Sequence, residues 1–97
     1  MPVMAEVGAA KDLLGRVATS RSGRDAGSVY IVVRVESPSV VFVADGRARS
    51  VSRPKRKNVK HLELGAPAAG LAERLGAGQS PTDEELRAAI GAGTGTE

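Results

Sequence analysis

The residues of this 97-residue chain best suited to chemistry are concentrated in one basic stretch, residues 46–62. The stretch contains seven lysines and arginines and no acidic residue: Arg47, Arg49, Arg53, Lys55, Arg56, Lys57 and Lys60. Cationic runs of this kind neutralise phosphates and release counterions. Arginine also makes bidentate phosphate contacts and stacks on unpaired bases. The stretch is therefore predicted to bind nucleic acid, and the alternative is a solvated surface loop.

A second, smaller basic group precedes it in a glycine-bracketed loop. Arg21 and Arg24 lie close together, and Gly23 and Gly27 frame Arg24-Asp25-Ala26. Two glycines at this spacing suit a tight reversal with positive φ angles. We expect the two arginines to contribute a second contact if the fold brings both basic loops to one edge.

The few aromatic residues limit how an RNA would be bound. Proteins that bind single strands usually stack bases on several rings, and the chain has one tyrosine and one phenylalanine, Tyr30 and Phe42. Phe42 is predicted to lie beside Arg47 and Arg49, either as a stacking position or as an apolar ring shielded by arginine stems. Recognition of the shape and backbone of structured RNA is favoured over base-by-base recognition.

Nothing in the sequence forms a catalytic or metal-binding constellation. The chain has no cysteine and a single histidine, His61, which has no partner histidine or cysteine nearby in the sequence. The glycines form neither a phosphate-binding loop nor a dinucleotide fingerprint. We therefore predict a binding protein without cofactor or metal rather than an enzyme.

The charge is divided unevenly along the chain, although the total is only +3. Residues 1–62 carry twelve lysines and arginines against five acids, whereas residues 63–97 carry two against six. A basic module followed by an acidic tail indicates a polyanionic partner for the first part. The sequence contains no secretory signal and no membrane-spanning run. We expect a cytoplasmic monomer that does not contact membranes.

Alternating patterns predict three strands, over residues 16–20, 29–35 and 40–44. In the second strand, the core face is predicted to carry four side chains: Val29, Ile31, Val33 and Val35. Arg34 places Tyr30 and Val32 on the opposite, solvent-reaching face. If Val33 and Val35 share the core with Val41 and Val43, parity requires an odd-numbered loop at residues 37–39.

The dipeptide Asp45-Gly46 predicts a two-residue hairpin turn, with Ala44 opposite Arg47. Pro54 and the adjacent charges predict a surface loop over residues 53–58. Residues 59–62 resume alternation and are predicted to form a closing strand. Four or five short strands with tight turns indicate a mainly β fold, a small bent antiparallel barrel.

The C-terminal third predicts helices rather than strands. Residues 66–75 are expected to form a short helix that Gly76 ends. Thr82 and Glu85 predict a capping box for a second helix near residues 82–90, ended by Gly91. This helix must dock on the barrel, dock on a partner or fray, because ten residues are marginal alone.

An ordered series of motifs resembles the KOW motif of ribosomal and transcription proteins. The matching residues are Gly15-Arg16-Val17, Gly23 to Gly27 and Val29 to Val35, then Val43-Ala44-Asp45-Gly46, Pro54-Lys55-Arg56-Lys57 and Lys60-His61-Leu62. The series is similar to the KOW-bearing ribosomal protein family numbered fourteen in archaea and eukaryotes, and to its small bacterial relatives described as KOW-domain RNA-binding proteins. It covers about residues 13–64.

This resemblance implies an SH3-like barrel over residues 13–64, between a flexible arm at 1–12 and a partly flexible, Gly/Ala-rich tail at 65–97. It also implies RNA binding with a ribosomal connection, ribosomal RNA being the expected partner. The alternative is a KOW-type protein-interaction module, in which the barrel edge or the acidic C-terminal helix binds a ribosomal or transcription protein. Such a module would have little RNA binding of its own.

Overall fold

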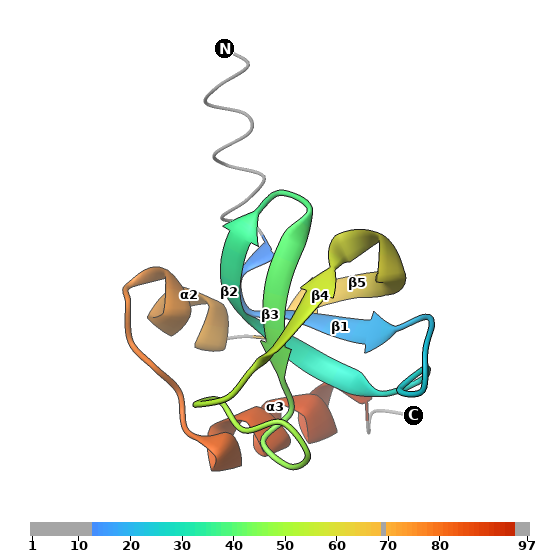
Figure 1. Ribbon diagram of the computed structural model, residues 1–97. Coiled ribbons are helices and arrows are strands. Elements are labelled where there is room, and N and C mark those ends of the chain that lie inside the picture. Colours follow the sequence, from blue (N-terminus) through green and yellow to red (C-terminus); the bar gives the residue numbers. More distant parts are fainter. Residues whose placement is uncertain (1–12, 69, 95–97) are drawn as a thin grey trace.

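The computed structural model describes residues 13–68 and 70–94, so the predicted N-terminal arm lies outside the described residues. Five strands form an antiparallel sheet in the order β4-β3-β2-β1-β5 (Figure 1). They are β1 (Arg16–Ser20), β2 (Val29–Ser37), β3 (Val40–Ala44), β4 (Lys55–Asn58) and β5 (Leu62–Pro67). A short 3₁₀ helix, η1 (Val59–His61), precedes β5, and two α-helices, α2 (Leu71–Gly76) and α3 (Asp83–Thr94), follow it. The mainly β prediction is confirmed.

The three predicted N-terminal strands are present, and the reversal between β1 and β2 forms as expected. Gly23 and Gly27 have φ angles of +83° and +92°, a region that side chains oppose. The amide of Gly27 donates to the carbonyl of Ser20, which closes the loop. This part of the chain was predictable because the glycine requirement is local.

Strand β2 divides its side chains between two hydrophobic clusters, because successive side chains of a strand point to opposite faces and both faces of this sheet are covered. The inner cluster, on one face of the sheet, comprises Leu13, Ala18, Tyr30, Val32, Val41, Val43 and Leu62. The helix-side cluster, on the opposite face, comprises Ile31, Ala44, Leu71 and Leu86. The predicted single core face was therefore wrong: Tyr30 and Val32 are buried, Ile31 faces the helices, and a register shift after Val32 returns Val35 to the inner cluster.

The β2–β3 connection is shorter than predicted. Ser37 pairs with Val40, which leaves Pro38 and Ser39 between them instead of a three-residue loop. A second register shift lies between Val35 and Ser37, and Val35 lies opposite Val41, as the parity argument required. Val33 does not meet the premise of that argument, because it packs against the helix-side cluster and Val32 lies opposite Val43.

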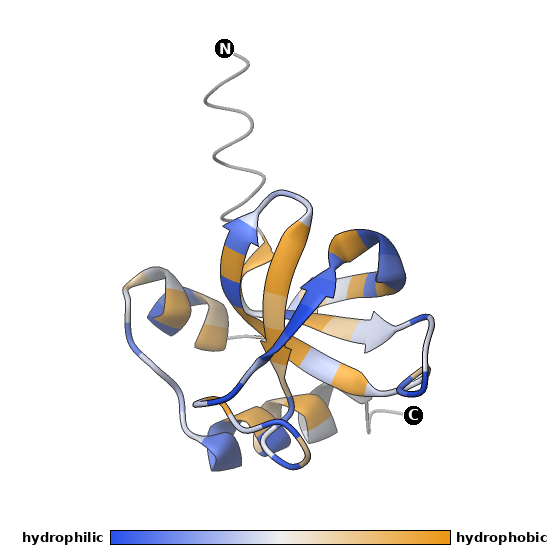
Figure 2. Cartoon of the chain, in the orientation of Figure 1, coloured by the Kyte–Doolittle hydropathy of each residue, from blue (hydrophilic) through white to orange (hydrophobic). Residues whose placement is uncertain are grey.

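Strand β3 pairs with β4 and not with the residues that follow Asp45-Gly46. Phe42 lies opposite Arg56 rather than Arg49, so the two-residue hairpin was wrong and a loop of residues 45–54 takes its place. The expected surface loop at 53–58 was wrong for Lys55–Asn58, which forms an edge strand. Figure 2 shows β4 as the hydrophilic strand at the sheet's end. An edge position tolerates both the charges and the neighbouring proline.

The remaining elements begin or end later than predicted. Residues 59–61 form η1 and the strand starts only at Leu62, because the Asn58 side chain accepts from the amide of Lys60 and caps the 3₁₀ turn. Since β5 continues to Pro67, α2 begins at Leu71 instead of residue 66. Helix α3 passes Gly91 and continues to Thr94.

Of the three alternatives for helix α3, the structure shows the first: the helix packs on the strands of its own chain. Leu86 is fully buried in the helix-side cluster, with Ala89 and Ile90 packed against that cluster. The capping box is confirmed: the Thr82 hydroxyl accepts from the amide of Glu85, and the Glu85 carboxylate accepts from the amide of Thr82. In the described ranges, no helix has the length and apolar character needed to cross a bilayer.

Candidate nucleic-acid interface

The predicted basic stretch is divided among three elements with different surroundings. Arg47, Arg49 and Arg53 lie in the β3–β4 loop, Lys60 lies in η1, and three cations lie on β4. The β4 cations alternate between faces: Lys55 and Lys57 lie opposite Val43 and Val41 of the inner cluster, and Arg56 lies opposite Phe42 on the outer face.

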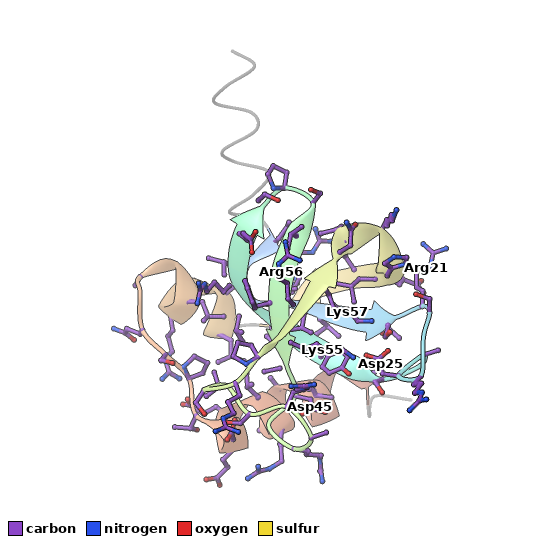
Figure 3. The ribbon with its side chains drawn as sticks, viewed as in Figure 1. Arg21, Asp25, Asp45, Lys55, Arg56 and Lys57 are labelled. Atoms are coloured by element: carbon purple, nitrogen blue, oxygen red, sulfur yellow. The ribbon has the colours of Figure 1, made fainter. Side chains whose placement is uncertain are left out.

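Lys55 and Lys57 point toward Asp25 of the β1–β2 loop (Figure 3). The Lys55 ammonium lies 3.1 Å from Asp25 Oδ2 and the Lys57 ammonium lies 3.3 Å from Oδ1. The hydroxyls of Tyr30 and Ser20 donate to the same carboxylate at 2.9 and 3.0 Å. We call these five residues the Asp25 network. It engages two of the predicted RNA-binding lysines within the fold, on a single carboxylate.

Burial separates the Asp25 network from an ordinary surface ion pair. The side chains of Asp25 and Lys57 are only 15% and 12% exposed, although that of Lys55 is 35% exposed. Burial raises the pKa of Asp25, but the hydrogen bonds from Lys55, Tyr30, Ser20 and Lys57 outweigh it and hold this pKa far below its usual range. The pKa of Tyr30 is raised, by burial and by its hydrogen bond to Asp25. The folded state therefore favours the ionised form of the Asp25 carboxylate.

The outer face of β2, β3 and β4 presents a different arrangement of cations. The Arg34 guanidinium lies over the Phe42 ring, 4.8 Å from its centroid. Arg56 forms a two-point ion pair with Glu36 at 3.2 and 3.3 Å, with both side chains largely exposed. Phe42 was predicted to lie beside Arg47 and Arg49, but the arginine that contacts its ring is Arg34.

The β3–β4 loop begins with a turn that Asp45 builds. Its Oδ1 accepts from the backbone amides of Arg47 and Arg49 at 2.8 and 2.9 Å, and Gly46 follows with a φ angle of +77°. The carboxylate thus holds a turn over residues 45–49 rather than the two-residue hairpin. Asp45 and Gly46 remain turn residues, as predicted, in a different turn.

Helix α3 holds the β3–β4 loop through three hydrogen bonds. Asp83 accepts from the Val51 amide at 2.7 Å and from the Ser50 hydroxyl at 3.0 Å, and Arg87 donates to the Gly46 carbonyl at 2.6 Å. A side chain at Gly46 would collide with the Asp83 carbonyl, so only glycine allows this approach. The loop is therefore held through its backbone and the Ser50 hydroxyl, and its arginine side chains are not used to hold it.

Six of the ten predicted binding residues are exposed cations for which the structure records no ion pair within residues 13–68 and 70–94. They are Arg21, Arg24, Arg47, Arg49, Arg53 and Lys60. The β1–β2 loop and η1 are adjacent, because Arg21 donates its amide to the His61 carbonyl at 2.8 Å and Ser22 hydrogen-bonds the His61 ring. Two exposed basic groups result: Arg21, Arg24 and Lys60 form the η1 group, and Arg47, Arg49 and Arg53 form the α3 group.

The acids of the same region do not oppose these cations. Residues 13–62 contain three carboxylates, and each has partners: Asp25 in its network, Glu36 with Arg56, and Asp45 with backbone amides. Within residues 13–62, the two basic groups therefore face no carboxylate that lacks a partner of its own. No cluster of His, Cys, Asp and Glu suited to a metal ion occurs in the part of the chain that the structure describes.

Sequence reasoning missed the roles of Asp25, Asp83 and Arg34. Asp25 was assigned only to a turn, and its lysine partners lie 30 and 32 residues away in the chain. No local pattern signals such contacts. The position of Arg34 opposite Phe42 depends on the register shift in β2.

No protein-family model matches the chain.

Proposed function

We propose that this protein is an RNA-binding module that contacts structured RNA through the η1 group and the α3 group. The observation that carries the proposal is the set of six exposed cations, unopposed by the carboxylates of residues 13–62. Phosphate contacts of this kind provide affinity and position without reading sequence. Lys55 and Lys57 are assigned to the fold, and Arg56 and Phe42 to secondary contacts on the outer face.

We further propose that the curved sheet is an SH3-like barrel of the KOW type, as the motif series suggests. Its support is the contact of Lys57 on β4 with Ser20 on β1, at 3.1 Å, although β3 and β2 lie between these strands in the sheet order. With that resemblance, ribosomal RNA is the expected partner, in the cytoplasm, for a monomer without catalytic activity.

The proposal is tested by filter binding of a structured ribosomal RNA fragment across a salt series. Replacing Arg47, Arg49 and Arg53 together by glutamine is expected to reduce the slope of log affinity against log salt by about 3, roughly one for each phosphate that is no longer neutralised. Affinity at fixed low salt falls in parallel, while the melting temperature changes little.

A matched control changes the net charge by the same amount in the connection between α2 and α3, outside both basic groups. Ala77, Gln79 and Ser80 are exposed between α2 and α3, and their joint replacement by glutamate also removes three positive charges in net. This control should retain most of the slope. Wild-type binding that does not weaken with salt, or an equal loss in both variants, would contradict the proposed interface.

The alternative, a protein-interaction module built on the acidic C-terminal helix, is less well supported. The apolar stripe of α3 faces the sheet, and two of its first-turn acids have partners: Asp83 in the β3–β4 loop and Glu85 on Arg74. Affinity capture with and without nuclease separates the alternatives. Partners that remain after nuclease treatment would favour protein interaction.

A further inference from the structure

A cavity of about 310 Å³ lies where the α3 group meets helix α3. Its lining combines apolar and charged residues from β2, the β3–β4 loop and the helix: Val29, Asp45, Arg47, Arg87, Ile90 and Gly91. The volume is at the small end of the range of about 300–1,000 Å³ typical of ligand sites. It suits one small planar group with a charged extension better than a large ligand.

The lining offers three kinds of contact to such a group. Val29 and Ile90 supply apolar surface at the junction between the sheet and α3. Two guanidiniums supply positive charge, and that of Arg87 is fixed by its bond to the Gly46 carbonyl. Asp45 supplies an acceptor: Oδ1 binds two backbone amides, whereas Oδ2 has no hydrogen-bond partner among the described residues.

We propose that this cavity holds one unpaired nucleotide of the bound RNA, an inference that rests on the proposed function. The base packs on Val29 and Ile90 and donates an N–H to Asp45 Oδ2, and Arg47 and Arg87 take its phosphate. An unpaired base combines the apolar face, the N–H donors and the adjacent negative charge that this lining complements. The α3 group then recognises a bulged or looped nucleotide within an otherwise structured RNA.

Gly91 allows the cavity to be blocked without changing a charge. A Cβ atom at Gly91 would meet no atom within 4 Å, so a side chain there enters open space at the cavity wall. Replacing this helical glycine by leucine is also compatible with α3, because leucine favours helix over glycine. The matched control is Ala88→Leu, which places the same side chain at an exposed position of α3 outside the cavity.

The experiment compares two hairpin RNAs that differ at a single bulged position, one with a guanosine there and one with an abasic nucleotide. The wild-type protein is expected to prefer the guanosine hairpin by about tenfold, the scale of one stacked base. Gly91→Leu should bind both hairpins with the affinity that the wild type has for the abasic one, while Ala88→Leu keeps the preference. Thermal melts of both variants verify the fold.

The outcomes separate this inference from the proposed function. Salt-dependent binding of both hairpins without a preference, or a preference that Gly91→Leu retains, would overturn the nucleotide site and leave the RNA-binding proposal standing. If Gly91→Leu keeps the preference for guanosine, the base binds elsewhere, and the cavity holds a different group, such as a side chain of a partner protein. Equal loss in Ala88→Leu would also overturn the site. Failure of the wild type to bind either hairpin would overturn both proposals.

Discussion

Two aspartates each hold a basic loop of this protein, and they do so with opposite consequences for its charge. Asp25 holds the β1–β2 loop against β4 by binding the ammonium groups of Lys55 and Lys57. Asp83 holds the β3–β4 loop against α3 by binding a backbone amide and a serine hydroxyl. The first arrangement uses positive charge to build the fold. The second leaves the loop's arginines available to a ligand.

The comparison shows that the number of cations in a sequence does not measure the charge a surface presents. Lys55 and Lys57 belong to the same basic run as Arg53, but strand alternation turns them to the inner face. The difference lies in the partners of the two aspartates. Asp25 binds charged lysine side chains, whereas Asp83 binds a backbone amide and a serine hydroxyl, both neutral. Four perturbations test this distinction.

The largest expected effect is the loss of Asp25. Asp25→Ala removes the carboxylate from two lysine ammoniums and from the buried Tyr30 hydroxyl, and we expect a loss of about 3 kcal/mol in the free energy of unfolding. Urea denaturation measures it. Glu63→Ala is the control, since it removes the same charge from an exposed position and should change stability little. Equal effects of the two substitutions would contradict a structural role for the network.

The second perturbation is acidification, which removes the charge of Asp25 without mutation. Because its pKa is lowered in the folded state, the unfolded chain binds the proton first as pH falls. The stabilisation is complete above the unfolded pKa of about 3.9 and is lost as pH falls toward the depressed folded value. Denaturation between pH 6 and 2 should show the gap between wild type and Asp25→Asn narrowing below about pH 4. A gap that stays constant would argue against this linkage.

A smaller effect is expected at the other aspartate. Asp83→Ala removes the acceptor for Val51 and Ser50, and we expect a loss of about 1–2 kcal/mol together with faster exchange of the Val51 amide. Hydrogen exchange followed by NMR measures the local change. Because no loop arginine is altered, the salt slope of RNA binding should remain while affinity falls. Unchanged exchange at Val51 would show that the loop is held by other contacts.

The smallest effect is expected from a substitution that weakens helix α3 but leaves its contact with the β3–β4 loop in place. Thr82→Ala removes the cap of α3 but none of the hydrogen bonds of Asp83, and we expect a loss of about 1 kcal/mol. Thermal denaturation measures the change, and exchange of the Val51 amide should stay near that of the wild type. Fast exchange in this variant as well would mean that the loop depends on the whole helix rather than on Asp83.

Features that depend on neighbours in the chain were predictable, and those that depend on distant partners were not. The positive φ angles of Gly23 and Gly27 and the capping box of Thr82 and Glu85 follow from local backbone requirements, and they are confirmed. The hairpin at Asp45-Gly46 was wrong although its signal is strong. Contacts of Gly46 with Asp83 and Arg87, about 40 residues later, select a different turn.

The candidate site was predictable in composition but not in geometry. The basic stretch identified the exposed cations Arg47, Arg49 and Arg53, and the same count included Lys55 and Lys57, whose partner lies in an earlier loop. The two register shifts in β2 had no signal in the alternating pattern. They decide which face each side chain of β2 reaches, including Arg34 beside Phe42.

The inward turn of the β4 lysines also has a consequence for association between copies of the chain. A strand at the end of an open sheet offers unpaired backbone groups to any extended segment, and charged side chains that point inward at such an edge discourage that pairing. Lys55 and Lys57 occupy these positions on β4. We therefore expect the Asp25 network to disfavour strand addition at β4 as well, and a neutral, well-packed replacement of the network to lose that effect.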